Sequence, residues 1–281
     1  MNSLSYYKKK KDLLICFDSD GCVMNTMDLK HENYFGPHLI EEWGLEKWKR
    51  EILNRWNEVN LSSKTRGINR FRGLAMILDE INQKYKRIEG VDKLLLWVNE
   101  SAELSEKELL FAVEQNPDET IFKKALNWSR SVNLDLENLS IKNKVPFPCA
   151  EDALELSKLH ADVAVVSSAN PKALEEEWEG HSLLRFTDIV FSQNDGSKSD
   201  CINELLKKGY EPSKVLMCGD APGDLHAAKK CGVYFFPIIY KKEEKSWKEF
   251  ISQALPRLVG GCYTSEYQEK KIREFTESLT D

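Results

Sequence analysis

Two aspartates separated by one residue close the first apolar run of the chain. Leu13–Phe17 leads directly into Asp18, Ser19 and Asp20, and a glycine follows. The run has the length and composition of a buried parallel strand, so both carboxylates are expected just past a strand end. Two acids at one strand tip repel each other, which predicts a cation or a lysine nearby. A simple turn or cap is the alternative that this pair alone leaves open.

Later apolar runs end in the same way. The polar residues that follow them are Ser167, Lys198, Asp220 and Asp224. Each has a simple alternative role, as a helix cap, a turn residue or a solvated charge. For Lys198 the alternative of a solvated charge is the weakest, because a cation at the start of a helix is mildly unfavourable. In a parallel sheet the carboxyl ends of all strands share one edge, so these side chains are expected to converge with Asp18 and Asp20.

Convergence of these residues would suit phosphoryl transfer. Clustered carboxylates form a hard oxygen site for Mg²⁺, and a carboxylate can itself attack phosphorus to give an acyl-phosphate. Lys198 and the metal would supply positive charge, while Ser167 and nearby backbone N–H groups would hold the phosphate oxygens. Asp20 would protonate the leaving oxygen and then deprotonate water.

The elements that position these residues alternate between strand and helix after residue 146. The expected strands are 162–166, 188–191, 214–217 and 233–236, and the expected helices are 151–159, 171–178, 199–208 and 225–231, with two further helices after 243. This alternation predicts an α/β fold with a parallel, Rossmann-like sheet. The strand at Leu13 has no partner nearby in sequence, so it should join this later sheet.

Residues 24–145 have a different character. Helical patterns are expected over 39–59, 72–85, 90–99, 106–115 and 118–131, and no convincing strand is present. Five of the seven tryptophans lie here, at spacings typical of a bundle core. The sequence therefore predicts a core domain of residues 1–23 and 146–281, interrupted by a helical domain of residues 24–145.

Composition narrows the class of protein. The 281 residues are 41% hydrophobic and 31% charged, as in ordinary globular proteins, and the net charge of −6 favours neither nucleic acid nor an anionic membrane as a partner. Seven cysteines without zinc spacing indicate a reducing, cytoplasmic location. The lysines at 8–11 precede only a short strand, so we expect a solvated arm rather than a signal peptide.

With these residues in hand, the chain resembles the haloacid dehalogenase (HAD) superfamily. The DxD motif of that family matches Asp18-Ser19-Asp20, its strand-end Ser/Thr matches Ser167, its lysine matches Lys198, and its GDxxxD motif matches Gly219–Asp224. The resemblance implies that Asp18 is the nucleophile and Asp20 the general acid/base. It also implies Mg²⁺ held by the Asp18 side chain, the Asp20 backbone carbonyl and Asp220, with Asp224 binding directly or through water.

The second aspartate of the motif also separates branches of the superfamily. Asp20 favours phosphatases and the related sugar-phosphate mutases. The insert resembles the helical cap of the C1 class, and a closing cap implies a small phosphorylated metabolite as substrate. Candidate substrate contacts are Ser168, Arg66 and Arg70, the two arginines lying in the basic stretch 64–73. A solvated connection between helices is the alternative for that stretch.

Three hypotheses follow. The first is a Mg²⁺-dependent phosphomonoester hydrolase that acts on a small phosphorylated metabolite through an aspartyl-phosphate. The second is a β-phosphoglucomutase-like isomerase that uses the same intermediate. The third is a non-catalytic protein that binds a phosphorylated metabolite on the same fold. The core motifs do not separate the first two, because the difference is whether water or a second hydroxyl accepts the phosphate.

Overall fold

The structure, a computed structural model, describes residues 4–281 and divides into two compact units. The α/β unit takes the chain up to Met27 and again from Ser140 to Asp281, and the helical unit is Asp28–Leu139. The two connecting segments run side by side inside the α/β unit, where Asn25 N–H donates to Val145 O (2.8 Å) and Met24 bridges to Pro146. Assignment of the units as a core domain and a cap remains a prediction.

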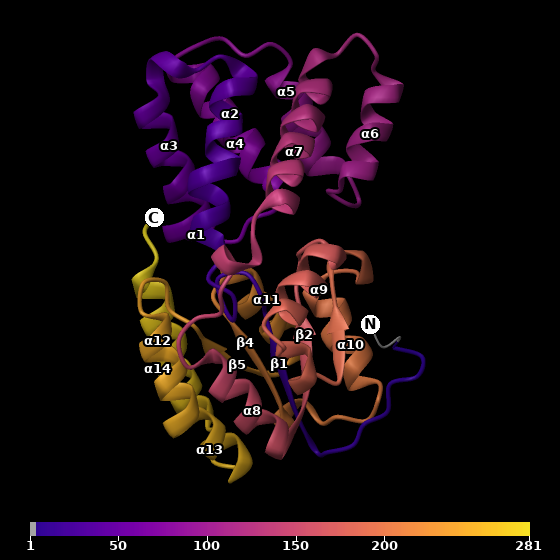
Figure 1. Ribbon diagram of the computed structural model, residues 1–281, viewed down its shortest axis with the longest axis vertical. Coiled ribbons are helices and arrows are strands. Elements are labelled where there is room, and N and C mark those ends of the chain that lie inside the picture. Colours follow the sequence, from indigo (N-terminus) through magenta and orange to yellow (C-terminus); the bar gives the residue numbers. More distant parts are fainter. Residues whose placement is uncertain (1–3) are drawn as a thin grey trace. The chain divides into compact units, whose positions relative to one another are not determined.

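The α/β unit contains a parallel sheet of five strands, in the order β3-β2-β1-β4-β5. Figure 1 labels β1, β2, β4 and β5 in this sheet. The strands are β1 (Leu13–Phe17), β2 (Ala161–Val166), β3 (Ile189–Phe191), β4 (Val215–Gly219) and β5 (Tyr234–Pro237). The first strand of the chain is the central one, as expected from its lack of a sequence neighbour. Phe17 pairs with Val165 on one side and Cys218 on the other, so the segments after β1, β2 and β4 leave the sheet at the same edge.

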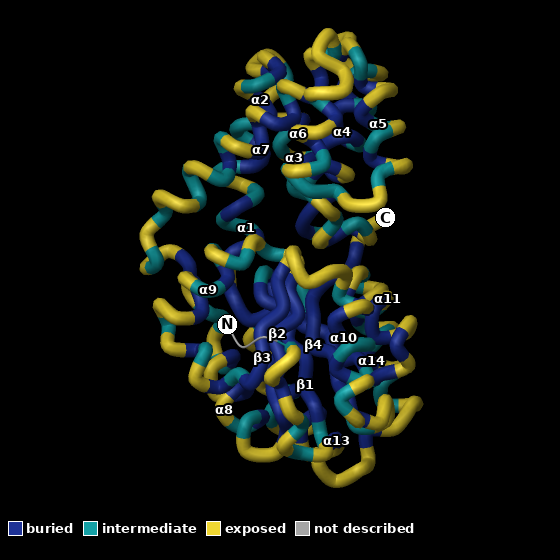
Figure 2. The backbone as a smooth tube through the Cα atoms, turned by 90° about the vertical axis from the view of Figure 1, so that its right-hand side faces the viewer, coloured by how far each residue is buried: buried dark blue, intermediate teal, exposed yellow. Residues whose placement is uncertain are grey.

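Helices cover both faces of this sheet, and the strands are buried between them (Figure 2). One face is covered by α8 (Ala150–His160), α9 (Pro171–Gly180), α12 (Glu243–Glu249) and α13 (Leu255–Val259), and the other by α10 (Lys198–Leu206), α11 (Pro222–Cys231) and α14 (Ser265–Ser278). Side chains alternate between the faces along β1: Ile15 and Phe17 pack on the first, Leu14 and Cys16 on the second. This arrangement confirms the predicted α/β fold.

The helical unit is built from α-helices joined by turns and π-helical segments. The α-helices are α1 (Met27–Lys30), α2 (Gly36–Trp43), α3 (Lys49–Asn57), α4 (Arg70–Lys84), α5 (Val91–Glu100), α6 (Glu106–Gln115) and α7 (Thr120–Asn138), with π-helical segments at His31–Phe35 and Glu58–Ser62. No β-strand lies in the described part of this unit. Trp43, Trp56 and Trp128 are buried, and Trp48 and Trp97 pack against the same core, which confirms the predicted role of these residues.

One expected helix was wrong in its extent. The single helix expected over 39–59 is broken, because Gly44 adopts a left-handed conformation (φ 60°) and ends α2 there. The C-terminal segment agrees with the two helices expected after 243: α12 continues without a break through a π-helical segment (Phe250–Ala254) into α13, and α14 follows separately. Hydrophobic periodicity alone does not detect the break at Gly44 when the apolar positions on either side stay in phase.

The lysine-rich N-terminal segment is exposed at Lys8 and Lys10, as expected of a solvated run, but its backbone is anchored to the α/β unit and is not a free arm. The backbone N–H groups of Lys10 and Lys11 donate to Asp162 Oδ2 (2.8 and 2.9 Å), and the Tyr210 hydroxyl donates to the same oxygen (2.5 Å). Asp162 is 1% exposed at the start of β2. A buried carboxylate needs hydrogen-bond donors, and the backbone N–H groups of Lys10 and Lys11 supply two of them.

β5 lies at an edge of the sheet and is bonded by the C-terminal segment. Phe235 N–H donates to Gln268 Oε1 (2.8 Å), and the Tyr263 hydroxyl donates to Phe235 O (2.7 Å). The polar backbone groups at the middle of this edge strand are therefore satisfied by side chains.

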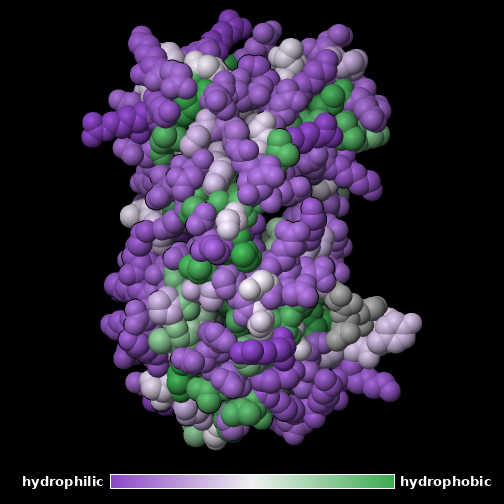
Figure 3. Space-filling model, in the orientation of Figure 1, coloured by the Kyte–Doolittle hydropathy of each residue, from purple (hydrophilic) through white to green (hydrophobic). Residues whose placement is uncertain are grey.

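The surface is mainly hydrophilic on the face shown in Figure 3. Small apolar areas interrupt it, and single exposed side chains such as Phe111 and Leu159 contribute to the accessible surface. None of the helices formed by residues 4–281 has the length and hydropathy needed to span a bilayer.

Candidate active site

Asp18 lies at the carboxyl end of the central strand. It directly follows Phe17, is 5% exposed, and its N–H donates to Cys218 O (3.0 Å) on the neighbouring strand β4. That bond extends the β1–β4 ladder by one residue beyond the strand. The backbone of Asp18 is therefore fixed by the sheet, while its side chain leaves the sheet at the edge.

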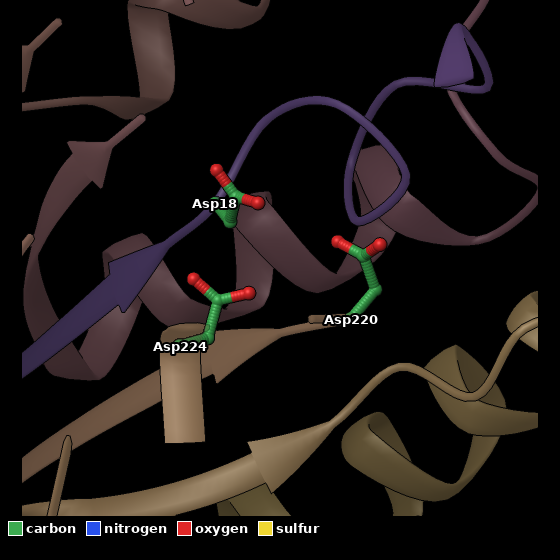
Figure 4. A group of neighbouring side chains, drawn as sticks. All are labelled: Asp18, Asp220 and Asp224. Carbon is green, nitrogen blue, oxygen red and sulfur yellow. The ribbon is translucent and has the colours of Figure 1, made fainter. Parts of the chain in front are cut away.

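Two further carboxylates come from the end of β4 and the start of α11. Asp220 directly follows β4, and Asp224 is the third residue of α11. Among the described residues, Asp18, Asp220 and Asp224 each offer a carboxylate oxygen within 4.8 Å of the others, and all three are buried (Figure 4). The structure thus brings together three of the acids predicted to converge.

Asp224 has two roles at once. Its Oδ2 accepts the N–H of Ala221 (3.0 Å) and so caps α11, which is the simple alternative role of this residue. Its Oδ1 accepts from Lys198 Nζ (2.5 Å). Gly219 makes this arrangement possible, because a Cβ there would lie 2.3 Å from Asp224 Cγ. The glycine of the motif is required by the close approach of this carboxylate to the strand end.

Lys198 supplies the positive charge that the sequence predicted. It is the first residue of α10, and its Nζ lies 2.9 Å from Asp18 Oδ2 and 2.5 Å from Asp224 Oδ1. Its side chain is 15% exposed. A cation at a helix start is unfavourable by itself, and here it pairs with Asp18, just after β1, and with Asp224 on α11.

The electrostatics of the cluster are set by burial and by this lysine. Burial raises the pKa of Asp18 well above its usual value, and Asp224 and Asp220 raise it further, while Lys198 opposes the rise. Burial alone would lower the pKa of Lys198, but attraction to Asp18 and Asp224 outweighs it and the pKa is raised. The lysine therefore stays protonated, and its charge favours ionised carboxylates beside it.

Asp20 lies beside this cluster, and its carboxylate is separate from the group of three. Thr26 Oγ1 donates to Asp20 Oδ1 (2.5 Å), and Thr26 is fully buried. Gly21 takes a left-handed conformation (φ 82°) that turns the chain directly after Asp20. Sequence reasoning missed Thr26, because a hydroxyl six residues after an aspartate carries no recognisable signal.

Ser167 follows β2, the neighbour of β1 on its other side. Its N–H donates to Phe191 O (3.1 Å), and its Oγ accepts the N–H of Ala169 (3.1 Å). The cap of α9 is Asn170, so the alternative role of Ser167 as helix cap was wrong. Ser167 is 5% exposed, whereas Ser168 is exposed to solvent.

A family model for haloacid dehalogenase-like hydrolases matches residues 97–238, half of the chain. The matched segment includes Ser167, Lys198, Asp220 and Asp224. The chain belongs to the haloacid dehalogenase-like hydrolase family. This confirms the resemblance that the motifs indicate. Asp18 and Asp20 lie before the matched segment. The strand that precedes them, β1, pairs with β4 inside that segment, and Asp18 also pairs with Lys198.

Solved structures share the fold. A haloacid dehalogenase-like family hydrolase from Xanthomonas campestris is 11% identical, with a TM-score of 0.53 and coverage of 91% of this chain and 97% of that one. A predicted phosphatase from Clostridium acetobutylicum is 13% identical, with a TM-score of 0.50 and coverage of 94% and 100%. A predicted phosphoglycolate phosphatase from Haemophilus somnus is 15% identical, with a TM-score of 0.50 and coverage of 82% and 87%. The comparison with curated proteins gave no match.

The two arginines of this HAD-like hydrolase that were expected to contact substrate lie in the helical unit. Arg66 is 2% exposed and donates to Leu61 O (2.5 Å), so the solvated connection considered as an alternative does not describe it. Arg70 begins α4 and donates to Asn133 Oδ1 (2.7 Å), and its guanidinium lies 4.9 Å from the centre of the Phe35 ring. Their role in substrate binding remains a prediction.

The donor set at the sheet edge fits a hard divalent cation. All side-chain donors of Asp18, Asp220 and Asp224 are carboxylate oxygens, close enough for one ion to contact all three. Soft or borderline metals prefer sulfur and imidazole, and this group contains neither. The group therefore has the donor chemistry of a site for a hard divalent cation.

Replacement of Lys198 by methionine should destabilise the metal-free protein by about 3–5 kcal/mol, because Asp18 and Asp224 would lose their buried cation. Urea denaturation followed by circular dichroism measures the change. The control is Lys207→Met, which removes an exposed pair with Glu204 and should cost less than about 0.5 kcal/mol. Equal small losses in both variants would contradict a neutralising role for Lys198.

Proposed function

We propose that this HAD-like hydrolase is a Mg²⁺-dependent phosphomonoester hydrolase that acts on a small phosphorylated metabolite through an aspartyl-phosphate. The observation that carries the proposal is the Asp18 carboxylate at a strand end, 2.9 Å from Lys198 and beside Asp220 and Asp224. A nucleophilic carboxylate needs positive charge beside it when it meets an anionic phosphate, and this arrangement provides it.

In the first half-reaction an oxygen of Asp18 attacks phosphorus, and the bond from phosphorus to the alcohol oxygen breaks. Asp20 gives its proton to the departing oxygen, which leaves as the alcohol. The positive charge of Lys198 stabilises the negative charge of the transferring phosphoryl group. Ser167 and the backbone N–H groups after β2 bind the oxygens of that group. Thr26 fixes the direction in which the Asp20 carboxylate points.

In the second half-reaction water replaces the alcohol. Asp20, now ionised, takes a proton from water as the water oxygen attacks phosphorus, and the bond from phosphorus to Asp18 breaks. Phosphate leaves and Asp18 returns as a carboxylate. The net reaction is phosphomonoester plus water giving alcohol plus phosphate, and each protein group ends in its starting state.

For Mg²⁺, the side chains of Asp18 and Asp220 and the backbone carbonyl of Asp20 are the proposed ligands, with Asp224 binding directly or through water. When bound, the ion supplies positive charge that offsets the repulsion between an anionic phosphate and an anionic nucleophile. Lys198 contacts one oxygen each of Asp18 and Asp224, and the second oxygen of Asp224 accepts the N–H of Ala221, so Asp224 is the weaker candidate for a direct ligand.

Other lines of support bear on the substrate and the location. Two similar structures are described as predicted phosphatases, which supports the choice of a phosphatase. The helical unit is the proposed cap, which would exclude water and limit substrate size. The cysteines at 16 and 218 are buried in strands and all seven are free thiols, in keeping with the proposed cytoplasmic location.

Asp18→Asn should lower phosphate release from a generic aryl phosphate by at least about a thousand-fold, because an amide cannot form the acyl-phosphate. The circular dichroism spectrum should be unchanged. The matched control is Asp12→Asn, an exposed carboxylate just before the same strand, with no expected effect. Activity that survives in Asp18→Asn would show that the nucleophile is another group.

The same assay separates the alternative functions. Interconversion of a sugar phosphate without release of free phosphate would favour the isomerase, and binding of a phosphorylated metabolite without any turnover would favour the non-catalytic protein.

Removal of Mg²⁺ with EDTA should abolish turnover, and added Mg²⁺ should restore it. Mg²⁺ should also stabilise the folded protein, by about 2.7 kcal/mol at a hundred times its Kd. Asp220→Asn should remove that stabilisation, whereas Asp200→Asn, at an exposed helix cap, should keep it. Thermal unfolding with and without Mg²⁺ provides the measurement, independent of activity. If EDTA changed neither the melting temperature nor the turnover, Mg²⁺ would have no role in this site.

Arg70→Met should raise KM about ten-fold for substrates that carry a second anionic group, because one charge-assisted hydrogen bond is lost. KM for a simple aryl phosphate should stay constant. Arg72→Met is the control: Arg72 is exposed two residues along the same helix and donates to Val98 O. Equal changes for both kinds of substrate would assign Arg70 to the stability of the helical unit.

A further inference from the structure

Two fully buried tryptophans donate hydrogen bonds to the loop that carries the two motif aspartates. Trp178 Nε1 on α9 donates to Ser19 Oγ (2.9 Å), and Trp247 Nε1 on α12 donates to Cys22 O (3.2 Å). Both indoles are 0% exposed. Their acceptors lie on either side of Asp20 and Gly21, so the loop is attached to the protein body before and after its turn.

The loop also has bonds of its own, which the indoles supplement. Ser19 O accepts the N–H of Cys22 (3.2 Å) and of Met24 (2.9 Å), and Gly21 N–H donates to Met24 O (2.9 Å). These bonds shape the turn without fixing its position relative to the sheet. The bond from Asp18 N–H to Cys218 O attaches the start of the loop to the sheet, and the bonds from Trp178 and Trp247 attach the rest of it to two helices that pack on one face of that sheet.

Packing holds each indole in place. The Trp247 ring lies 5.9 Å from the ring of Phe17, the residue just before Asp18, and 5.6 Å from the ring of Phe250. Trp178 lies on α9, which begins immediately after the Ser167 loop and is capped by Asn170. One helix therefore connects the loop of Asp18 and Asp20 with the loop proposed to hold the phosphate oxygens.

We infer that Trp178 and Trp247 are positioning residues, which act through Ser19 and Cys22 to hold Asp18 and Asp20 at their working distance. The inference rests on the proposed function. It goes further because it assigns a positioning role to α9 and α12, two helices that carry no motif residue. A nucleophile and an acid that serve one phosphorus atom need fixed separation, because a shift of about 1 Å can cost 10²-fold in rate.

A purely structural role would need only the apolar volume of the indoles. Trp178→Phe and Trp247→Phe keep an aromatic ring and remove the N–H, so they separate volume from hydrogen bonding. Each variant should lower kcat about ten-fold while KM for an aryl phosphate changes less than two-fold, because orientation of Asp18 and Asp20 is lost and not substrate affinity.

Ser19→Ala tests whether Trp178 acts through its hydrogen bond to Ser19. It deletes the acceptor hydroxyl, is a smaller change than removing an indole, and should lower kcat as much as Trp178→Phe does. The double variant should be no slower than either single variant, because both remove the same bond. Additive losses would mean that Trp178 does not act through Ser19.

Trp128→Phe is the matched control. Trp128 is also 0% exposed and its Nε1 donates to a backbone carbonyl, that of Phe35 (3.0 Å), but it lies in the helical unit. This variant should lose stability comparable to that of Trp178→Phe and keep its kcat. Equal kcat in Trp178→Phe, Trp247→Phe and Trp128→Phe would overturn the inference.

Hydrogen exchange gives a readout that does not need turnover. Amides of residues 18–24 should exchange faster in Trp178→Phe, and at the wild-type rate in Trp128→Phe. A wild-type protein that releases no phosphate would contradict the proposed function, and exchange would then decide the inference by itself. Unchanged exchange at 18–24 in both tryptophan variants of the α/β unit would overturn it.

Discussion

Burial of like charges is the constraint on which this structure depends. Asp18, Asp220 and Asp224 are close together and shielded from water, and carboxylates in that state repel each other and lose hydration. Lys198 offsets part of that cost by meeting two of them at once. The sheet makes the arrangement possible, because the ends of parallel strands deliver residues from distant parts of the sequence to one edge.

The same side chains also serve the fold. Asp224 caps α11 with one oxygen and pairs with Lys198 through the other, and the close approach excludes any residue but glycine at position 219. Lys198 in turn is the first residue of α10. Two helices that pack on the same face of the sheet are thus joined through the charges of the candidate site, and that site is part of the scaffold.

The fold class and the members of the cluster were predictable from the sequence for one physical reason. A polar residue directly after a buried strand has a known place in a parallel sheet, so Asp18 and Asp220 could be brought together from the sequence, with Lys198 at the start of the α-helix after β3. The bond from Thr26 to Asp20 and the indole bond from Trp178 to Ser19 were not predictable. They depend on side-chain directions between segments up to 159 residues apart, which neither periodicity nor propensity describes.

The side chains bonded to β5 have a consequence for the association of whole molecules. An outer strand with open backbone groups can pair with the strand of another molecule and begin aggregation. At Phe235 both backbone groups are already engaged, by Gln268 and Tyr263 of the C-terminal segment. That segment carries no motif residue, yet it protects the chain from intermolecular strand addition.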